Sequence, residues 1–228
     1  MKKEPTERKP IMVNAKILRA LRHIAAKQDI RYYLNGVQFK AGPGGKEYVA
    51  TDGHKIGAFH EGWEKDEHAQ DLDIIIPRAV CAGIKLPKKT MPAWLRPSGT
   101  HQWILESGGD EPYQIFHAID GKFPEWQKVI PDKCRGTAGA YNWNYLAQFG
   151  ACLKEVVGDG FSVCLKQNGE EAAIVTHPTA SFLGVLMPMR MGDFPLPGWA
   201  ADAQKANVAR KTREQSETEA RGRASVPA

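Results

Sequence analysis

Two short segments limit how the first third of this chain can fold. The segment RYYLNGV (residues 31–37) is rich in aromatic and branched side chains and contains Asn-Gly, which is typical of a strand that ends in a turn. The segment ATDGHKI (residues 50–56) contains Thr-Asp-Gly, a turn that needs a permissive backbone. We therefore expect a hairpin here. The residues that it would bring together are Leu34, Thr51, His54 and Ile56.

Two further strings follow in the sequence. They are GKFPEW with VIP (residues 121–126 and 129–131) and VLMPMR (residues 185–190). In this order, the four strings resemble those of the bacterial β sliding clamp family, whose ring tethers DNA polymerase to its template. The resemblance covers residues 10–191. The usual clamp chain has three domains, whereas this chain matches the middle domain and the second half of the last, a shortened form.

The same order of elements, a strand, a helix and three strands, is expected three times. The first unit should hold a strand at 11–13, a helix capped by Asn14 and running to about 26, and strands at 32–39, 46–50 and 56–60. The second should hold a strand at 72–76, a helix at 78–86 after Pro77, a proline-rich loop at 87–100, and strands at 102–106 and 113–119. The third should hold a helix at 144–156 and strands at 161–167, 171–177 and 182–189.

The resemblance implies an α+β fold of clamp architecture, in which helices line a central hole and sheets lie outside. It also implies a complete domain at residues 10–131 and a half domain at 132–191 that pairs with another subunit. Residues 1–9 form a basic N-terminal extension. The tail at 192–228 is polar, and we expect it to be disordered or partly helical around 202–220.

Composition narrows the class of protein. No apolar run approaches the roughly 18 residues of a membrane span. Four cysteines without a Cys-x-x-Cys pair indicate reduced thiols in a cytoplasmic protein. The resemblance to the clamp family implies a bacterial cell and association with the nucleoid. A net charge of +5 makes a polyanionic partner plausible.

A basic stripe is expected beside the apolar face of the first helix. Ile17, Leu21 and Ile24 recur at helical spacing and should face the core. The cations on a neighbouring face are Lys16, Arg19, His23 and Lys27, and the second unit adds Arg78, Lys85, Lys88 and Lys89. Such a stripe is either an ordinary solvated surface or a face for DNA phosphates. Resemblance to a clamp favours sequence-independent contact with double-stranded DNA.

The resemblance also implies a pocket that binds short peptides of partner proteins. Its residues would be Leu34, Thr51, Gly53, His54, Lys55, Ile56, Pro124, Lys128, Val129, Val185, Leu186, Met187, Pro188, Met189 and Arg190. Taken singly, Leu34, Ile56 and Val185 are more typical of core residues, and it is the joint occurrence of the separate strings that favours a pocket. Apolar clefts with a few polar edges suit linear peptides, and methionines adapt to several partners.

No enzyme motif stands out in the sequence. Asp52, His54, His60 and His68 match no zinc or iron spacing, so we expect no metal, no cofactor and no catalytic residue, although a metal-dependent hydrolase using Asp52 and His54 is a third possibility. The glycine-rich segment at 42–46 has no helix after it and is better explained as a hairpin turn.

The resemblance implies a processivity factor that encircles duplex DNA and binds a DNA polymerase, a clamp loader and other proteins with clamp-binding motifs. The alternative is a decoy or adaptor that binds such peptides without encircling DNA. We expect a homotetramer, with a dimer as the second choice, because clamp rings contain twelve units and this chain has three. An uncovered apolar helix face in the third unit would mark the interface. Its residues would be Leu146, Phe149 and Leu153.

Overall fold

The computed structural model describes residues 9–64, 71–86, 92–99, 101–107, 113–159, 163–178, 181–190 and 197–224. The chain divides into two compact units, Met1–Arg190 and Met191–Ala228. Among the described residues, no helix is both long enough and apolar enough to cross a membrane. The second unit contains one helix, α4 (Gly198–Ala224), which covers the range where a partial helix was predicted.

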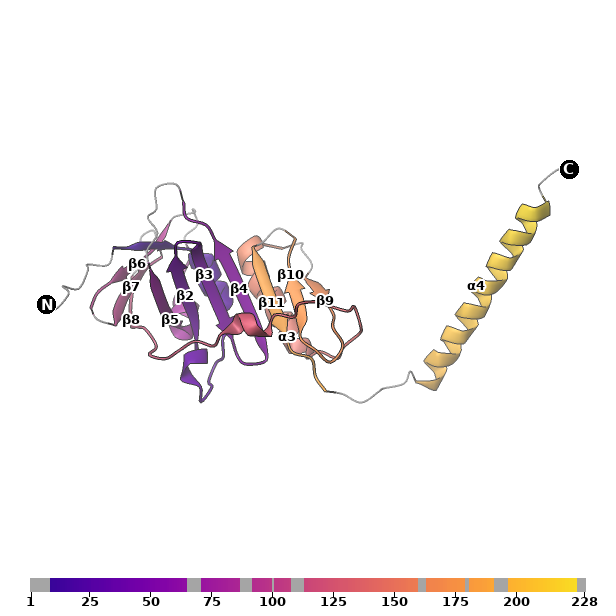
Figure 1. The fold of residues 1–228 in the computed structure, drawn as a ribbon, viewed down its shortest axis with the longest axis horizontal. Coiled ribbons are helices and arrows are strands. Elements are labelled where there is room, and N and C mark those ends of the chain that lie inside the picture. Colours follow the sequence, from indigo (N-terminus) through magenta and orange to yellow (C-terminus); the bar gives the residue numbers. More distant parts are fainter. Residues whose placement is uncertain are drawn as a thin grey trace. The chain divides into compact units, whose positions relative to one another are not determined.

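Three successive groups of elements make up the larger unit (Figure 1). The first group is β1 (Ile11–Val13), α1 (Ala15–Leu21), the 3₁₀ helix η1 (Tyr32–Leu34), β2 (Gly36–Gly42), β3 (Gly45–Thr51) and β4 (Lys55–Glu61). The second is β5 (Leu72–Pro77), α2 (Arg78–Gly83), β6 (Ala93–Pro97), β7 (Gln102–Glu106), β8 (Gln114–His117) and the 3₁₀ helix η2 (Trp126–Val129). The third is α3 (Trp143–Val157), β9 (Cys164–Lys166), β10 (Ala173–Thr176) and β11 (Phe182–Leu186).

Two antiparallel sheets connect these groups. The first two groups exchange their opening strands, since β1 joins a four-stranded sheet of order β1-β6-β7-β8 while β5 pairs with β2. The other sheet has seven strands, in the order β5-β2-β3-β4-β11-β10-β9, which lie side by side in Figure 1. Because β11 pairs with β4, this sheet runs without a break from the first group into the third.

Several predicted elements have different bounds. The first helix ends at Leu21 and not near residue 26, because Ala26 N donates to Leu34 O (3.1 Å) in place of a helical bond. Residues 32–34, predicted as strand, form η1, with Leu34 N donating to Arg31 O (2.8 Å). The second helix ends at Gly83, three residues early, because Ile84 turns to an extended conformation and is buried.

The proline-rich segment at 87–100, predicted as a loop, contains β6. Ala93 and Leu95 are buried on the inner face, and the strand pairs with both β1 and β7. Alternate burial of two apolar residues therefore outweighs the nearby prolines. In the third group, β9, β10 and β11 are each shorter than predicted.

Two glycines lie opposite each other where β4 meets β11. Gly57 is paired with Gly184. A Cβ at Gly57 would lie 3.1 Å from Ile24 Cγ1, and one at Gly184 would lie 2.8 Å from both Phe149 Cε1 and Val175 Cβ. The side chains that follow α1 and those of α3 therefore pack directly on the backbone of the junction.

The third group does not expose the apolar helix face that was predicted. Phe149 and Leu153 are buried in the main core, and Leu146 is partly buried against it. α3 achieves this burial by packing on α1 as well as on its own sheet. The expectation of an uncovered face was wrong, because the first group of the same chain covers it.

The outer face of the seven-stranded sheet carries a second, smaller core. Phe123 and Trp126, from the segment that follows β8, pack with Val49, Ile75 and Val185 of the sheet. In Figure 1 this segment crosses the strands on the side away from α1 and α3. It holds the outer face of the sheet together across the first and third groups.

An ion cluster also joins α1 to α3. Glu155 of α3 accepts from Arg19 Nε (2.8 Å), and it pairs with Arg22 Nη2 (2.6 Å) and His23 Nε2 (2.8 Å). The Glu155 side chain is only 14% exposed. Burial raises the pKa of this carboxyl, but the hydrogen bonds from Arg22, His23 and Arg19 outweigh that effect and hold the pKa at about 2.

The glycine contact predicts a position-specific loss of stability. Gly184→Ala should lower the free energy of unfolding by about 1–3 kcal/mol, because the new methyl group meets Phe149 and Val175. Gly150→Ala is the matched control, since Gly150 lies within α3 and a Cβ there meets nothing within 4 Å. That control should leave stability unchanged or raise it by up to about 1 kcal/mol. Urea unfolding that gives the same change for both variants would contradict this packing.

The ion cluster predicts a pH-dependent contribution to stability. At pH ~7, Glu155→Gln should lower the free energy of unfolding by about 1–2 kcal/mol after solvent screening is allowed for. The folded-state pKa lies below the ordinary value of roughly 4.3, so the contribution is complete above that value and is lost as the pH falls toward about 2. The gap between wild type and variant in urea unfolding should therefore narrow in acid. Glu170→Gln, in an exposed turn, should show no such gap.

Candidate functional site

A hollow of about 190 Å³ opens where β3 ends and β4 begins. Its walls come from η1, from the turn between β3 and β4, from the segment around η2, and from β11 with the residue after it. The residues that line it are Arg31, Tyr33, Leu34, Thr51, Gly53, His54, Lys55, Ile56, Pro124, Glu125, Trp126, Val129, Val185 and Met187.

Ten of the fifteen residues predicted for a pocket are brought together here. They are Leu34, Thr51, Gly53, His54, Lys55, Ile56, Pro124, Val129, Val185 and Met187. Four lining residues were missed, namely Arg31, Tyr33, Glu125 and Trp126. Each lies inside a string already singled out, so extending the prediction along RYYL and PEW would have found them.

The other five predicted residues lie outside the lining. Leu186 is fully buried in the main core because side chains alternate along β11, with Val185 on the outer face. Lys128 is exposed and pairs with Glu125. The chain leaves the hollow after Met187, so the lining does not include Pro188, Met189 or Arg190. Met189 N donates instead to Ala140 O (2.7 Å).

The floor of this pocket crosses the junction between the first and third groups. Ile56 of β4 is directly opposite Val185 of β11, and Thr51 of β3 is the other neighbour of Ile56. Ile56 and Val185 both belong to the outer apolar cluster. An intact junction is therefore needed to form the floor.

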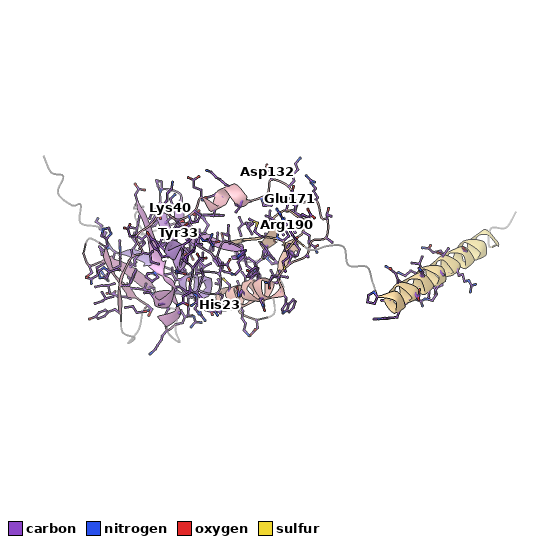
Figure 2. The ribbon with its side chains drawn as sticks, turned by 90° about the horizontal axis from the view of Figure 1, so that it is seen from below. His23, Tyr33, Lys40, Asp132, Glu171 and Arg190 are labelled. Atoms are coloured by element: carbon purple, nitrogen blue, oxygen red, sulfur yellow. The ribbon has the colours of Figure 1, made fainter. Side chains whose placement is uncertain are left out.

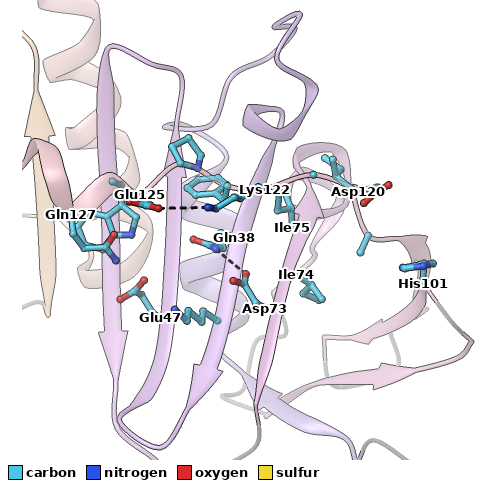
Figure 3. Close-up of a pocket in the computed structure, with 17 residues that line it drawn as sticks. Gln38, Glu47, Asp73, Ile74, Ile75, His101, Asp120, Lys122, Glu125 and Gln127 are labelled. Carbon is cyan, nitrogen blue, oxygen red and sulfur yellow. Dashed lines mark hydrogen bonds and ion pairs between the residues drawn. The ribbon is translucent and has the colours of Figure 1, made fainter. Parts of the chain in front are cut away.

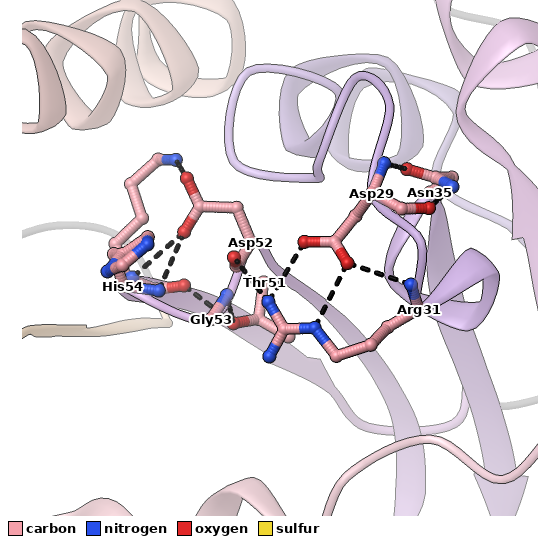
Figure 4. Close-up of polar contacts among 8 residues, drawn as sticks. Asp29, Arg31, Asn35, Thr51, Asp52, Gly53 and His54 are labelled. Carbon is pink, nitrogen blue, oxygen red and sulfur yellow. Dashed lines mark hydrogen bonds and ion pairs between the residues drawn. The ribbon is translucent and has the colours of Figure 1, made fainter.

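The turn between β3 and β4 is held by its own polar groups (Figure 4). Thr51 Oγ1 donates to Lys55 O (2.8 Å) and accepts from Gly53 N (3.0 Å). Asp52 Oδ1 accepts from His54 N (2.9 Å) and Lys55 N (3.0 Å). Gly53 has a φ of +90°, a conformation that favours glycine. The turn is thus a compact, self-bonded unit at the rim.

A second polar group supports the rim from the side of η1. Arg31 donates from N and Nε to Asp29 Oδ1 (2.8 and 3.0 Å) and from Nη2 to Asp29 Oδ2 (2.9 Å). These hydrogen bonds lower the pKa of Asp29 to about 2. Arg31 Nη2 also donates to Asp52 O (3.5 Å), which connects this pair to the turn, as Figure 4 shows. The arrangement fixes the Arg31 guanidinium at the mouth as one half of an ion pair.

Lys55 behaves differently from the other basic residues, because its side chain is only 2% exposed. Burial lowers the pKa of Lys55, while its contact with the Asp52 carboxylate raises it in opposition. Lys55 Nζ also lies 4.8 Å from the centre of the Tyr145 ring. The charge is therefore satisfied inside the protein and faces α3.

A larger hollow of about 560 Å³ lies on the same sheet and shares Pro124, Glu125 and Trp126 with the smaller one. Figure 3 shows its polar residues, of which two pairs bond to each other. Gln38 Nε2 donates to Asp73 Oδ1 (2.8 Å), and Lys122 Nζ lies 3.5 Å from Glu125 Oε1. The smaller hollow, with its apolar floor, is the better candidate for binding a partner.

The predicted basic stripe is divided in the structure. Arg19 and His23 bind Glu155, and His23 and Lys27 lie beyond the end of α1, so the single helical stripe was wrong. Lys16 and Lys27 are exposed. Figure 2 places His23 on the side opposite Lys40, so this surface is away from the outer face of the sheet.

The cations of the second group are also only partly available. Arg78 Nε donates to Arg22 O (2.9 Å), which ties this guanidinium to the segment after α1. Lys85 is exposed and lies after the end of α2. Lys88 and Lys89 are outside the described residues.

The residues considered for a metal do not gather. Within the described part of the chain, no three His, Cys, Asp or Glu side chains form a group that could hold an ion. Asp52 is engaged by Lys55, and His60 Nε2 lies 3.2 Å from Gly44 O. His68 is outside the described residues.

No protein-family model matches the chain, but individual proteins do. The β sliding clamp of Haemophilus influenzae is 30% identical over 137 residues, which are 58% of this chain and 35% of that protein. The β sliding clamp of Buchnera aphidicola is 24% identical over 204 residues, which are 88% of this chain and 47% of that protein. The chain thus spans between about a third and a half of the length of these two relatives.

Solved structures show the same likeness. DNA polymerase III subunit beta from Pseudomonas aeruginosa aligns with a TM-score of 0.62 at 18% identity, covering 84% of this chain and 68% of that one. The pol III beta of Caulobacter crescentus aligns with a TM-score of 0.62 at 16% identity, covering 84% and 69%. The chain therefore has the α+β fold of the bacterial β sliding clamps and is related to them in sequence.

Proposed function

We propose that this protein is a DNA sliding clamp that docks replication proteins through short peptides bound in the 190 Å³ pocket. The observation that carries the proposal is the meeting of ten predicted pocket residues, from four separate strings, around one hollow. The role is that of a non-catalytic accessory subunit for a DNA polymerase and its clamp loader, acting on DNA in the cytoplasm.

The pocket suits a short apolar anchor. Its volume is below the roughly 300–1,000 Å³ of pockets for drug-sized ligands, so it accommodates one or two apolar side chains. Ile56 and Val185 form the floor, Pro124 and Val129 one wall, and Met187 adapts to the shape of the ligand. The exposed His54 and Arg31 are placed to bond the peptide backbone or a polar side chain next to the anchor.

Contact with duplex DNA would be electrostatic and independent of sequence. Lys16 and Lys27 are the exposed cations near α1 that such contact would use first. Because Arg19 and His23 are already bonded to Glu155, they add less than the sequence suggested. Binding would therefore be weak and would fall steeply with salt.

The assembly that best fits a ring is a homotetramer, with a dimer as the second choice. Twelve units complete a clamp ring, and each chain supplies three, the third of which has no opening strand among the described residues. Phe149 and Leu153 are covered within the chain, so they are not the interface. The sheet edges at β8 and β9, which pair with one strand each in the described part of the chain, are the surfaces where copies would join.

One observation favours an alternative. Engagement of Arg19, Arg22 and His23 by Glu155 reduces the positive charge available beside α1. A decoy or adaptor that binds clamp-binding peptides without encircling DNA would keep the pocket and would not need that charge.

The pocket is tested by a peptide of the clamp-binding type, a glutamine followed by aliphatic and aromatic residues. Micromolar or tighter affinity is expected. Ile56→Ala and Met187→Ala should each weaken it by about five- to a hundredfold, since each removes apolar contact worth about 1–3 kcal/mol. Met189→Ala is the matched control, because Met189 is 46% exposed and lies outside the lining. If fluorescence anisotropy gave equal affinities for wild type and the three variants, the pocket assignment would be wrong.

The ring is tested by the mass of the assembly in solution. Light scattering at micromolar concentration should give four times the chain mass of 25.2 kDa, or twice that mass for the dimer. A stable mass of one chain would rule out a ring. Together with peptide binding, that mass would support the adaptor alternative.

A further inference from the structure

Tyr145, in the first turn of α3, does not line the pocket but contacts its rim. Its ring stacks on the His54 imidazole, with ring centres 5.8 Å apart and an interplanar angle of 13°. The same ring lies 4.8 Å from Lys55 Nζ. One aromatic side chain of the third group therefore touches two consecutive residues of the first group, at the point where the turn meets β4.

These contacts hold both the side chains and the backbone of the turn. The Lys55 ammonium is buried between the Asp52 carboxylate and the Tyr145 ring, and a desolvated cation is held strongly by both. Asp52 also accepts the backbone N–H groups of His54 and Lys55. A displacement of the Lys55 side chain would therefore also displace Asp52 and the backbone N–H groups that Asp52 accepts from.

The pairing of β3 with β4 holds the two ends of the turn. Three contacts from outside the turn add to that support. Arg31 reaches Asp52 O from one side at 3.5 Å, which is the long limit of a hydrogen bond. Met187 N donates to His54 O (3.0 Å), and Tyr145 holds the side chains of His54 and Lys55. Two of the three supports thus come from the third group.

We propose that Tyr145 is a positioning residue for the peptide pocket, which orients His54 and makes the pocket competent only when α3 is docked on α1. The proposal rests on the proposed function of that pocket. It adds a form of regulation, because peptide binding and docking of the third group then favour each other. A partner or subunit that shifted α3 would alter peptide affinity without touching the pocket.

Three variants separate positioning from general stability. Tyr145→Leu removes the stack and the cation contact but keeps apolar volume, and Tyr145→Phe keeps the ring. Leu146→Ala is the control, since Leu146 is the neighbouring α3 residue and packs against the core instead of the turn. Affinity for the clamp-binding peptide is measured by calorimetry below the unfolding transition of each protein.

Tyr145→Leu should weaken peptide binding by about three- to tenfold, the range for an aromatic contact together with a cation–π contact. Tyr145→Phe and Leu146→Ala should stay within about twofold of wild type. In ¹H–¹³C NMR spectra, the His54 imidazole signals should lose their ring-current shift in Tyr145→Leu and keep it in Tyr145→Phe. A structural defect alone would not produce that pattern.

Wild-type affinity in Tyr145→Leu, with His54 signals displaced, would overturn the positioning role and leave the pocket intact. An equal loss in Leu146→Ala would also overturn it, because the effect would then be general. Absence of peptide binding by wild type would instead remove the proposed function. If Tyr145→Leu does not fold, the wild-type protein alone tests the proposal. The proposal would be refuted if the His54 imidazole signals of wild type did not move at saturating peptide.

Discussion

The antiparallel pairing of β4 with β11 is the interaction on which the rest of the structure depends. On its inner side, Gly57 and Gly184 leave room for Ile24 and Phe149, so the elements of two groups share one core. On its outer side, the same pairing sets Ile56 beside Val185 and so builds the pocket floor. Stability and binding therefore rest on one set of backbone hydrogen bonds.

Charged residues near this junction are paired with one another inside the protein and so stabilise the fold. Glu155 gathers Arg19, Arg22 and His23 between α1 and α3, and Asp52 holds Lys55 beneath the rim. A basic residue on a helix is therefore no direct measure of a DNA-binding surface, because a carboxylate from a distant part of the chain can neutralise it. This face retains for a polyanion the exposed Lys16 and Lys27, together with the arginine charge that a single carboxylate leaves unbalanced.

Sequence predicted the order of the elements because turns and strands are marked locally, and the resemblance to the clamp family predicted most of the pocket. In the string ATDGHKI, the turn is fixed locally by the backbone conformation of Gly53 and by the hydrogen bonds of Asp52. Features that depend on distant partners were missed. The early end of α1 depends on Leu34 O, the strand β6 on its pairing with β1, and the burial of Phe149 on α1. The inward position of Leu186 followed from strand alternation, but only once the face of β11 was known.

The most direct test of this account is a crystal structure of the protein with a clamp-binding peptide. The account predicts an apolar peptide side chain in contact with both Ile56 and Val185, and the His54 ring still stacked on Tyr145. A peptide bound instead in the 560 Å³ hollow beside Gln38 and Asp73, with the smaller pocket empty, would contradict it.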